Sequence, residues 1–235
     1  MKLSIIKPGF DRKVVYARLG AETDMRTISG KVRKNVDRAY ENLMEISSPS
    51  IFYTSEDITC IENNRIEIAN NIHLKSRKLA KTVRECNELI SFVGTLGEDV
   101  DKAIATTMKK GRVSDAFIMD AVASSFMEHI IQMFWQEKGT ALQKKENRYA
   151  TVRFSPGYCD WPVTGQKKLF KVLSENPIKV MLSESMLMSP RKSVSGVFGI
   201  SEPGSGNELK NYLPCRDCTR ADCAERRFES GTREN

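Results

Sequence analysis

The sequence has no long uninterrupted hydrophobic run. Its longest apolar stretch, Ala116–Trp135, contains Asp120, Glu128 and His129, whose polar side chains are costly in hydrocarbon. The apolar run within residues 1–8 is too short for a secretory signal. We therefore expect no transmembrane segment and a cytoplasmic location.

Histidine is also scarce: the 235 residues include only His73 and His129, so no nucleophile–histidine–aspartate set is evident. Glycine (14) and proline (8) occur in ordinary numbers, which excludes a low-complexity chain, and a hydrophobic share of 40% excludes a wholly disordered one. A chain of this length forms one large domain or two small ones and folds without needing a disulfide or metal. In the cytoplasm its six cysteines are expected as thiols or ligands.

Acidic residues are too few to balance the basic ones, and the net charge is +7. Residues 1–40 carry ten basic and four acidic side chains, so much of the excess lies near the start of the chain. Such a segment is either a docking face for an acidic partner or a solvated helix surface, and the sequence alone favours the second. Neither interleaved aromatic residues nor a recognition-helix motif accompanies it, so we expect no nucleic-acid binding.

The spacing of apolar residues predicts an α+β fold. Helices are expected over residues 11–19, 25–46, 76–86, 98–108, 113–138 and 164–173, the fifth of them ending at Gly139. Strands are expected over residues 51–60, 65–68, 88–96, 148–154, 179–187 and 193–200. Because strands and helices do not alternate regularly, this order argues against a doubly wound parallel sheet.

Residues 153–158 combine groups suited to a small charged ligand. Arg153 can grip a carboxylate or phosphate with two parallel hydrogen bonds, and Tyr158 offers a flat aromatic surface. The intervening Ser-Pro-Gly turn is expected to leave backbone N–H and C=O groups free for a ligand. From the residues alone, the alternative is favoured: a turn that closes the core, with Arg153 in a structural ion pair.

Several segments nevertheless occur together in an order and spacing that resembles a known family. They are Phe-Val-Gly-Thr-Leu-Gly at 92–97, Arg-Phe-Ser-Pro-Gly-Tyr at 153–158, Lys-Leu-Phe at 168–170, Leu-Ser-Glu-Ser at 182–185 and Ser-Val-Ser-Gly at 193–196. Over about residues 11–201 the chain is similar to the activation (reactivation) domain of cobalamin-dependent methionine synthase, in its short, free-standing form. The resemblance implies a C-shaped single domain over residues 1–201, with a twisted antiparallel sheet flanked by helices. A loop-like tail follows over residues 202–235.

For the site, the resemblance implies S-adenosylmethionine binding in a shallow groove, with Arg153 on the methionine carboxylate. The turn that meets the rest of the ligand comprises Ser155, Pro156, Gly157 and Tyr158. The long enzymes of the family use helix carboxylates for the ligand's ammonium group, and the closest matching position here is Ser124. Glu128 lies one helical turn later on the same face and is the expected replacement, the alternative being an ordinary exposed helix glutamate.

Three cysteines, Cys215, Cys218 and Cys223, cluster in the tail. Thiolates this close together can share a zinc ion or an iron–sulfur cluster, although three ligands are one short of a closed site. Cys159, Cys60 or a partner would supply the fourth. The alternative is a flexible extension without metal.

The family implies an accessory protein that uses S-adenosylmethionine as methyl donor. It would support the reductive methylation, and so the reactivation, of the corrinoid in methionine synthase or a related corrinoid methyltransferase. The implied partners are this corrinoid-carrying methyltransferase, which holds the cobalamin, and a flavodoxin-like or other electron donor. Whether the chain is itself an enzyme stays open. One alternative is a metal- or iron–sulfur-carrying redox or scaffold protein that keeps the fold but not the ligand site; a basic nucleic-acid-binding module is more distant.

Overall fold

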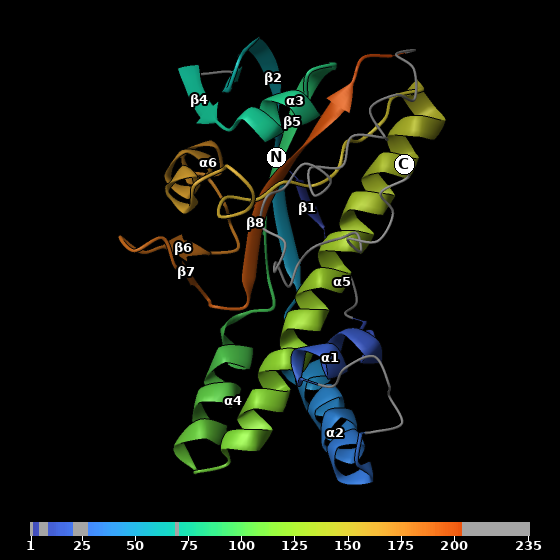
Figure 1. Cartoon of the computed structure of the whole chain (residues 1–235), viewed down its shortest axis with the longest axis vertical. Coiled ribbons are helices and arrows are strands. Elements are labelled where there is room, and N and C mark those ends of the chain that lie inside the picture. Colours follow the sequence, from blue (N-terminus) through green and yellow to red (C-terminus); the bar gives the residue numbers. More distant parts are fainter. Residues whose placement is uncertain (1, 5–8, 21–27, 69–70, 204–235) are drawn as a thin grey trace, which may run out of the picture. The chain divides into compact units, whose positions relative to one another are not determined.

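The computed structural model describes residues 2–4, 9–20, 28–68 and 71–203. Its main sheet contains β1 (Lys2–Ser4), β2 (Ser50–Glu62), β3 (Arg65–Ile68), β4 (Ile72–Lys75), β5 (Cys86–Thr95) and β8 (Ser193–Ser201). The strand order is β4-β3-β2-β5-β8, and β1 pairs antiparallel with β2 (Figure 1). A separate antiparallel hairpin joins β6 (Met181–Leu182) to β7 (Met188–Ser189).

The helices are α1 (Arg12–Arg18), α2 (Gly30–Ile46), α3 (Arg77–Thr82), α4 (Glu98–Lys109), α5 (Val113–Glu146) and α6 (Gln166–Val172), with a 3-10 turn, η3 (Val163–Gly165), before the last. Side chains cap the first three of these helices, because Asp11, Ser29 and Ser76 each accept a hydrogen bond from a backbone N–H of the first turn. Helix α4 instead carries three acidic residues in its first turn, where the helix dipole favours them. Mixed helices and antiparallel strands confirm the predicted α+β class.

Contacts divide the chain into two compact units, to both of which β2, β5 and β8 contribute residues. The first unit comprises Met1–Tyr53, Phe92–Glu137 and Glu175–Val194, and the second comprises Thr54–Ser91, Lys138–Ser174 and Ser195–Asn235.

The core of the first unit is built on the buried side of α5. Phe134 is fully buried, and its ring centroid lies 5.1 Å from that of Tyr53 and 5.8 Å from that of Phe92. Helix and strand approach closely at Gly94, where an added methyl group would lie 2.9 Å from the Cδ1 atom of Ile131. The side of α5 that carries Ile131 and Phe134 is therefore the face that packs, whereas Met133 is 42% exposed.

In the second unit, Trp161 is fully buried and its ring centroid lies 6.2 Å from that of Phe154. Arg148 joins the ends of three elements. Its Nη1 atom lies 2.8 Å from Glu88 of β5 and 3.3 Å from Glu146 of α5, and its Nε donates to the carbonyl of Ser201 in β8. The Arg148 side chain is only 12% exposed, and its charge-assisted bonds hold the end of α5 against the two strands.

Several boundaries differ from the sequence prediction. Helix α5 continues through Gly139 to Glu146, since a single glycine costs only about 1 kcal/mol in a helix and does not end it. Residues 148–154 form two isolated bridges to β8 rather than a strand, and residues 179–187 contain the turn of the β6–β7 hairpin rather than one continuous strand. Strand β4 occupies residues for which no strand was predicted.

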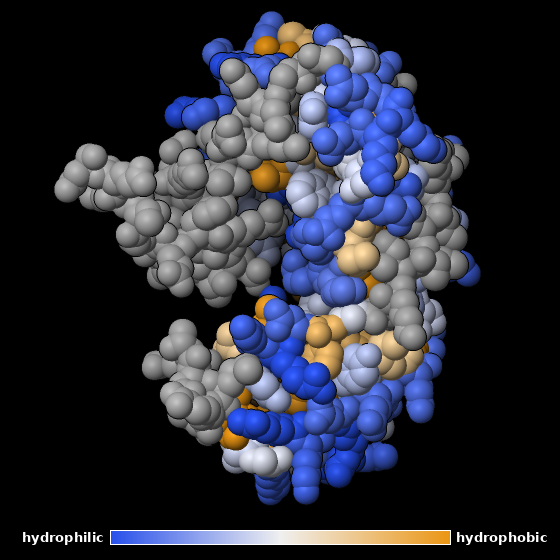
Figure 2. All heavy atoms as spheres, turned by 90° about the vertical axis from the view of Figure 1, so that its right-hand side faces the viewer, coloured by the Kyte–Doolittle hydropathy of each residue, from blue (hydrophilic) through white to orange (hydrophobic). Residues whose placement is uncertain are grey.

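No helix within the described residues is long and apolar enough to cross a membrane. The face drawn in Figure 2 is mostly hydrophilic, with hydrophobic side chains in small groups between the polar ones. Residues 204–235 lie outside the described part of the chain, and with them lie Cys215, Cys218 and Cys223. The predicted boundary between residues 201 and 202 therefore stays a prediction.

Candidate functional site

The strongest sequence motif forms a closed turn in the second unit, which we name the Arg153 turn (residues 153–161). Phe154 exchanges two backbone hydrogen bonds of 2.8 Å with Val197 of β8, which fixes the start of the turn to the sheet. Gly157 has a φ of +94°, a conformation that side-chain-bearing residues rarely adopt, and its N–H donates to the carbonyl of Trp161 at 2.8 Å. The buried Trp161 anchors the other end of the turn in the core.

The outer side of the Arg153 turn presents both side chains and backbone. Arg153 and Ser155 are half-buried, Pro156 is buried, and Gly157 and Tyr158 are exposed. The N–H groups of Gly157 and Tyr158 donate hydrogen bonds inside the turn. They are therefore not available to a ligand, although the sequence predicted free N–H groups in this turn. Within the described residues, the N–H of Ser155 and the carbonyls of Pro156 and Gly157 make no hydrogen bond, and these groups remain for a ligand.

Asp160 attaches the Arg153 turn to the first turn of α3. Its carboxylate accepts from the Ser76 hydroxyl at 2.6 Å and from the Arg77 N–H at 2.7 Å, with longer bonds from the Lys78 N–H. Burial by itself raises the pKa of Asp160, but the hydrogen bonds from Ser76, Lys78 and Arg77 outweigh it and lower the pKa below its ordinary value. The ionised carboxylate is therefore the form that holds the turn in place.

Ser124, the position that the sequence resemblance matched to a ligand carboxylate, contacts a lysine in this chain. Ser124 of α5 donates to the carbonyl of Asp120 and accepts from the Lys192 ammonium at 2.9 Å. Lys192 also pairs with the Asp120 carboxylate at 2.8 Å, and its side chain is 14% exposed. Asp120 and Glu128 lie one turn before and one turn after Ser124 on the same face of α5, and both are half-buried. The role predicted for Glu128 stays a prediction.

The structure brings Arg153, Ser155, Pro156, Gly157 and Tyr158 together in one turn. Glu128 belongs to the first unit and the Arg153 turn to the second. Asp160 was missed by the sequence analysis. Ser76 is recognisable in the sequence as a helix cap, but its partner Asp160 lies 84 residues away, and no local pattern links the two.

The described cysteines form no disulfide with one another: Cys60 and Cys159 are exposed and Cys86 is buried. Burial, together with the nearby Glu85 charge, raises the pKa of Cys86 to about 12, so it stays protonated and unreactive. Desolvation and the Glu62 charge also raise the pKa of Cys60. Among the described residues, no three histidine, cysteine or acidic side chains are grouped so that they could hold a metal ion.

The chain has the fold of a methionine synthase reactivation domain. It resembles the solved structure described as "Crystal Structure of the MetH Reactivation Domain bound to AdoHcy" with a TM-score of 0.66 and 15% sequence identity, over 91% of this chain and 81% of that one. At this identity the likeness shows the fold. The sequence model of the family "Vitamin B12 dependent methionine synthase, activation domain" matches residues 69–211, more than half of the chain. The chain therefore belongs to this family, as its motifs predicted; among curated proteins none matches it.

Proposed function

We propose that the chain binds S-adenosylmethionine at the Arg153 turn and, as an accessory protein in the cytoplasm, supports the reductive methylation of a corrinoid held by methionine synthase or a related methyltransferase. The observation that carries this proposal is the family match over residues 69–211, which includes the whole Arg153 turn. The solved relative of the same fold is bound to AdoHcy, the demethylated form of S-adenosylmethionine.

The groups that the turn presents suit this ligand. The Arg153 guanidinium can form two charge-assisted bonds to the methionine carboxylate, and the unbonded backbone groups of Ser155, Pro156 and Gly157 can meet polar atoms of the adenosyl part. Tyr158 is 47% exposed and offers its ring face to the adenine or to the positive sulfonium. The role that the sequence resemblance suggested for Glu128, at the ligand's ammonium group, stays a prediction.

The proposed reaction needs positioning rather than proton transfer. An electron donor of the flavodoxin class supplies one electron, which reduces the partner's cobalt(II) to cobalt(I). The cobalt(I) electron pair then bonds to the methyl carbon while the carbon–sulfur bond breaks and leaves its electron pair on sulfur, giving methylcobalt(III) and AdoHcy. Because no proton moves in these steps, the chain's task is to bind and orient the donor. The scarcity of histidine agrees with that task.

Isothermal titration with AdoHcy and with S-adenosylmethionine tests the binding step, and absence of detectable heat at millimolar ligand contradicts the proposal. The accessory role is tested by adding the chain to an inactive cobalt(II) methyltransferase with a one-electron donor. Methylcobalamin should then form only when both the chain and S-adenosylmethionine are present. No observation on the described residues favours the alternative of a redox or scaffold protein that carries a metal.

A further inference from the structure

Two segments of the second unit carry basic residues and no acidic ones. Residues 71–84, which form β4 and α3, and residues 161–174, which form η3 and α6, contain no aspartate or glutamate. Their eight lysines and arginines are Lys75, Arg77, Lys78, Lys81, Arg84, Lys167, Lys168 and Lys171. The local charge is therefore more one-sided than in residues 1–40, where four acidic side chains are interspersed.

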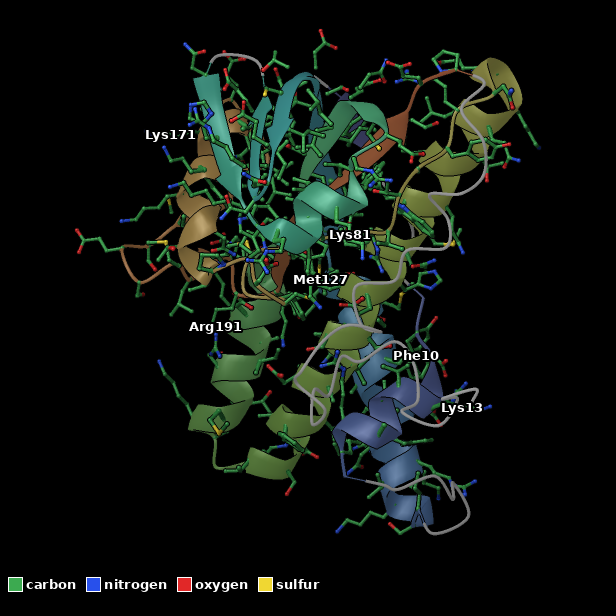
Figure 3. The ribbon with its side chains drawn as sticks, turned by 45° about the horizontal axis from the view of Figure 1, so that its top comes forward. Phe10, Lys13, Lys81, Met127, Lys171 and Arg191 are labelled. Carbon is green, nitrogen blue, oxygen red and sulfur yellow. The ribbon has the colours of Figure 1, made fainter. Side chains whose placement is uncertain are left out.

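The fold brings these two segments together. Helix α6 contacts β4, and α3 follows β4 after a single residue, Ser76. Figure 3 shows Lys171 on α6 and Lys81 on α3, with β4 next to both helices. Seven of the eight are exposed, and one of these, Arg84, is paired with Glu85. We name the other six the α3–α6 basic surface: Lys75, Arg77, Lys81, Lys167, Lys168 and Lys171.

Four side chains of this surface are not paired with a nearby carboxylate that the structure describes. Glu67 on β3 pairs with Arg65 and His73, and Asp160 binds the Ser76 hydroxyl and backbone N–H groups of α3. Within the described residues, the side chains of Arg77 and of Lys167, Lys168 and Lys171 on α6 form no ion pair. Their charges are therefore available to an external partner.

The Arg153 turn adjoins this surface, because Asp160 of the turn is bonded to Ser76 and Arg77 at the start of α3. Transfer of a methyl group requires the donor and acceptor atoms to approach within about 3–3.5 Å. A partner that takes the methyl group must therefore cover the turn, and in doing so it meets the protein surface around it. That surface is basic on the side of α3.

We propose that the α3–α6 basic surface is the docking face for the corrinoid-carrying partner, whose matching face is acidic. This inference rests on the proposed function and adds to it the place and the electrostatic character of the contact. Charges at the edge of an interface act mainly on the association rate and on partner choice, and salt screens them. The basic residues of α2 belong to the other unit and are not part of this face.

The test compares two triple variants that each remove three positive charges. Lys167→Gln, Lys168→Gln and Lys171→Gln act on α6, and Lys31→Gln, Lys34→Gln and Arg38→Gln on α2 serve as the matched control. Surface plasmon resonance measures association with a cobalamin-loaded methionine synthase core at low and high salt, and titration with AdoHcy checks the ligand site. The α6 variant should associate about tenfold more slowly at low salt and lose most of its salt dependence, while the control changes less than about twofold and both retain AdoHcy affinity.

Equal losses in the two variants would show that only net charge matters, and a loss confined to the control would place the contact on α2; either result overturns the proposal. Failure of the wild-type chain to associate with the core, despite normal AdoHcy binding, overturns it too. Binding of DNA or of phosphatidylserine vesicles through the α6 lysines, with core association unchanged, would assign the surface to another anion and refute the docking role. Failure to bind AdoHcy at all refutes the proposed function instead.

Discussion

At the scale of single residues, Arg153 carries the most weight, because it is half-buried at the start of the turn and a bond to a ligand carboxylate is strengthened by partial shielding from water. Arg153→Ala should weaken S-adenosylmethionine and AdoHcy binding by about 1.5–3 kcal/mol, the usual contribution of a hydrogen bond to a charged group. Arg153→Lys keeps the charge but not the fork geometry and should recover part of the loss. Titration calorimetry measures both, and unchanged affinity in the alanine variant would remove Arg153 from the site.

Asp160 supports the same turn through its hydrogen bonds to the start of α3. Asp160→Asn removes the charge from its bonds to Ser76 and Arg77 and should lower the free energy of unfolding by about 1 kcal/mol, because hydrogen bonds to a charged acceptor are stronger than those to a neutral amide. AdoHcy affinity should fall with it, because the turn is less well fixed. Asp57→Asn is the matched control, an exposed carboxylate on β2 in the same unit. Equal stability and affinity for the two variants would show that Asp160 does not position the turn.

The same bonds predict a pH dependence. Because the folded-state pKa of Asp160 lies below its unfolded value, the carboxylate stabilises the fold fully above the unfolded pKa of about 3.9 and loses that contribution as the pH falls through the lowered pKa. Urea unfolding of wild type and Asp160→Asn should therefore differ by a constant amount between about pH 5 and 7. The difference should shrink in more acidic solution, and a difference that grows toward acid would contradict this assignment.

Part of this site can be predicted from the sequence, because it depends on neighbouring residues. The rest depends on contacts between residues that are far apart in the sequence. Arg153 and Tyr158 are visible because their chemistry and spacing are local. Which backbone groups of the turn stay available depends on how it closes, and that depends on the burial of Trp161 and the φ of Gly157. The support from Asp160 depends on residues more than 80 positions earlier.

At the scale of helices and strands, boundaries that depend on neighbouring residues are predicted well from the sequence. Boundaries that depend on tertiary contacts are predicted poorly. Helix α1 starts after its cap Asp11, and β3 begins after the Asn63-Asn64 turn, so both are readable from a few residues. Strand β4 exists because its backbone pairs with β3, from Ile68↔Ile72 to Arg65↔Lys75. The stretch 148–154 reads as a strand by composition, but it touches β8 only at isolated bridges, since its partners are not continuous.

Helix α5 contains one residue whose helix propensity is low. Gly139 lies inside the helix, and an added methyl group would meet only the Cβ of Ala150 at 3.5 Å, an ordinary contact distance. Gly139→Ala should therefore stabilise the protein by about 0.5–1 kcal/mol, through the lower backbone entropy of alanine. Thermal unfolding checks this. Gly94→Ala is the contrasting variant and should destabilise, because its methyl would lie 2.9 Å from Ile131.

Helix α2 carries the basic excess noted near the start of the chain, and Arg33, Lys34 and Arg38 are exposed on it. If this helix is the docking face for the electron donor, an acidic flavodoxin-like protein should bind less tightly as ionic strength rises, because salt screens the attraction. Reversing the three charges to glutamate should abolish the salt dependence and most of the binding. Salt-independent association, or equal binding after charge reversal, would assign α2 to the solvated-surface alternative.

At the scale of the whole molecule, the residues that the family model matches do not coincide with either of the two units. Residues 69–211 include parts of both units, and the strands β2, β5 and β8 contribute to both. The candidate ligand residues are divided likewise, with Glu128 in the first unit and the Arg153 turn in the second. Isolated halves of the chain would each lack part of these strands, so the whole chain is the object to test.

The tail provides the last test at this scale, because Cys215, Cys218 and Cys223 lie beyond the described residues and their spacing alone predicts a metal or cluster. Bound thiolates must be deprotonated, so metal uptake should release protons. Protein purified without oxygen should contain zinc or iron by elemental analysis and lose it when all three cysteines are replaced by serine. AdoHcy affinity should survive that replacement, because the Arg153 turn is anchored to β8 and α3 rather than to the tail.

Metal-free anaerobic protein with three freely alkylated tail thiols would leave the tail as a flexible extension. Loss of AdoHcy binding together with the cysteines would show that the tail contributes to the ligand site and that the boundary near residue 201 is wrong.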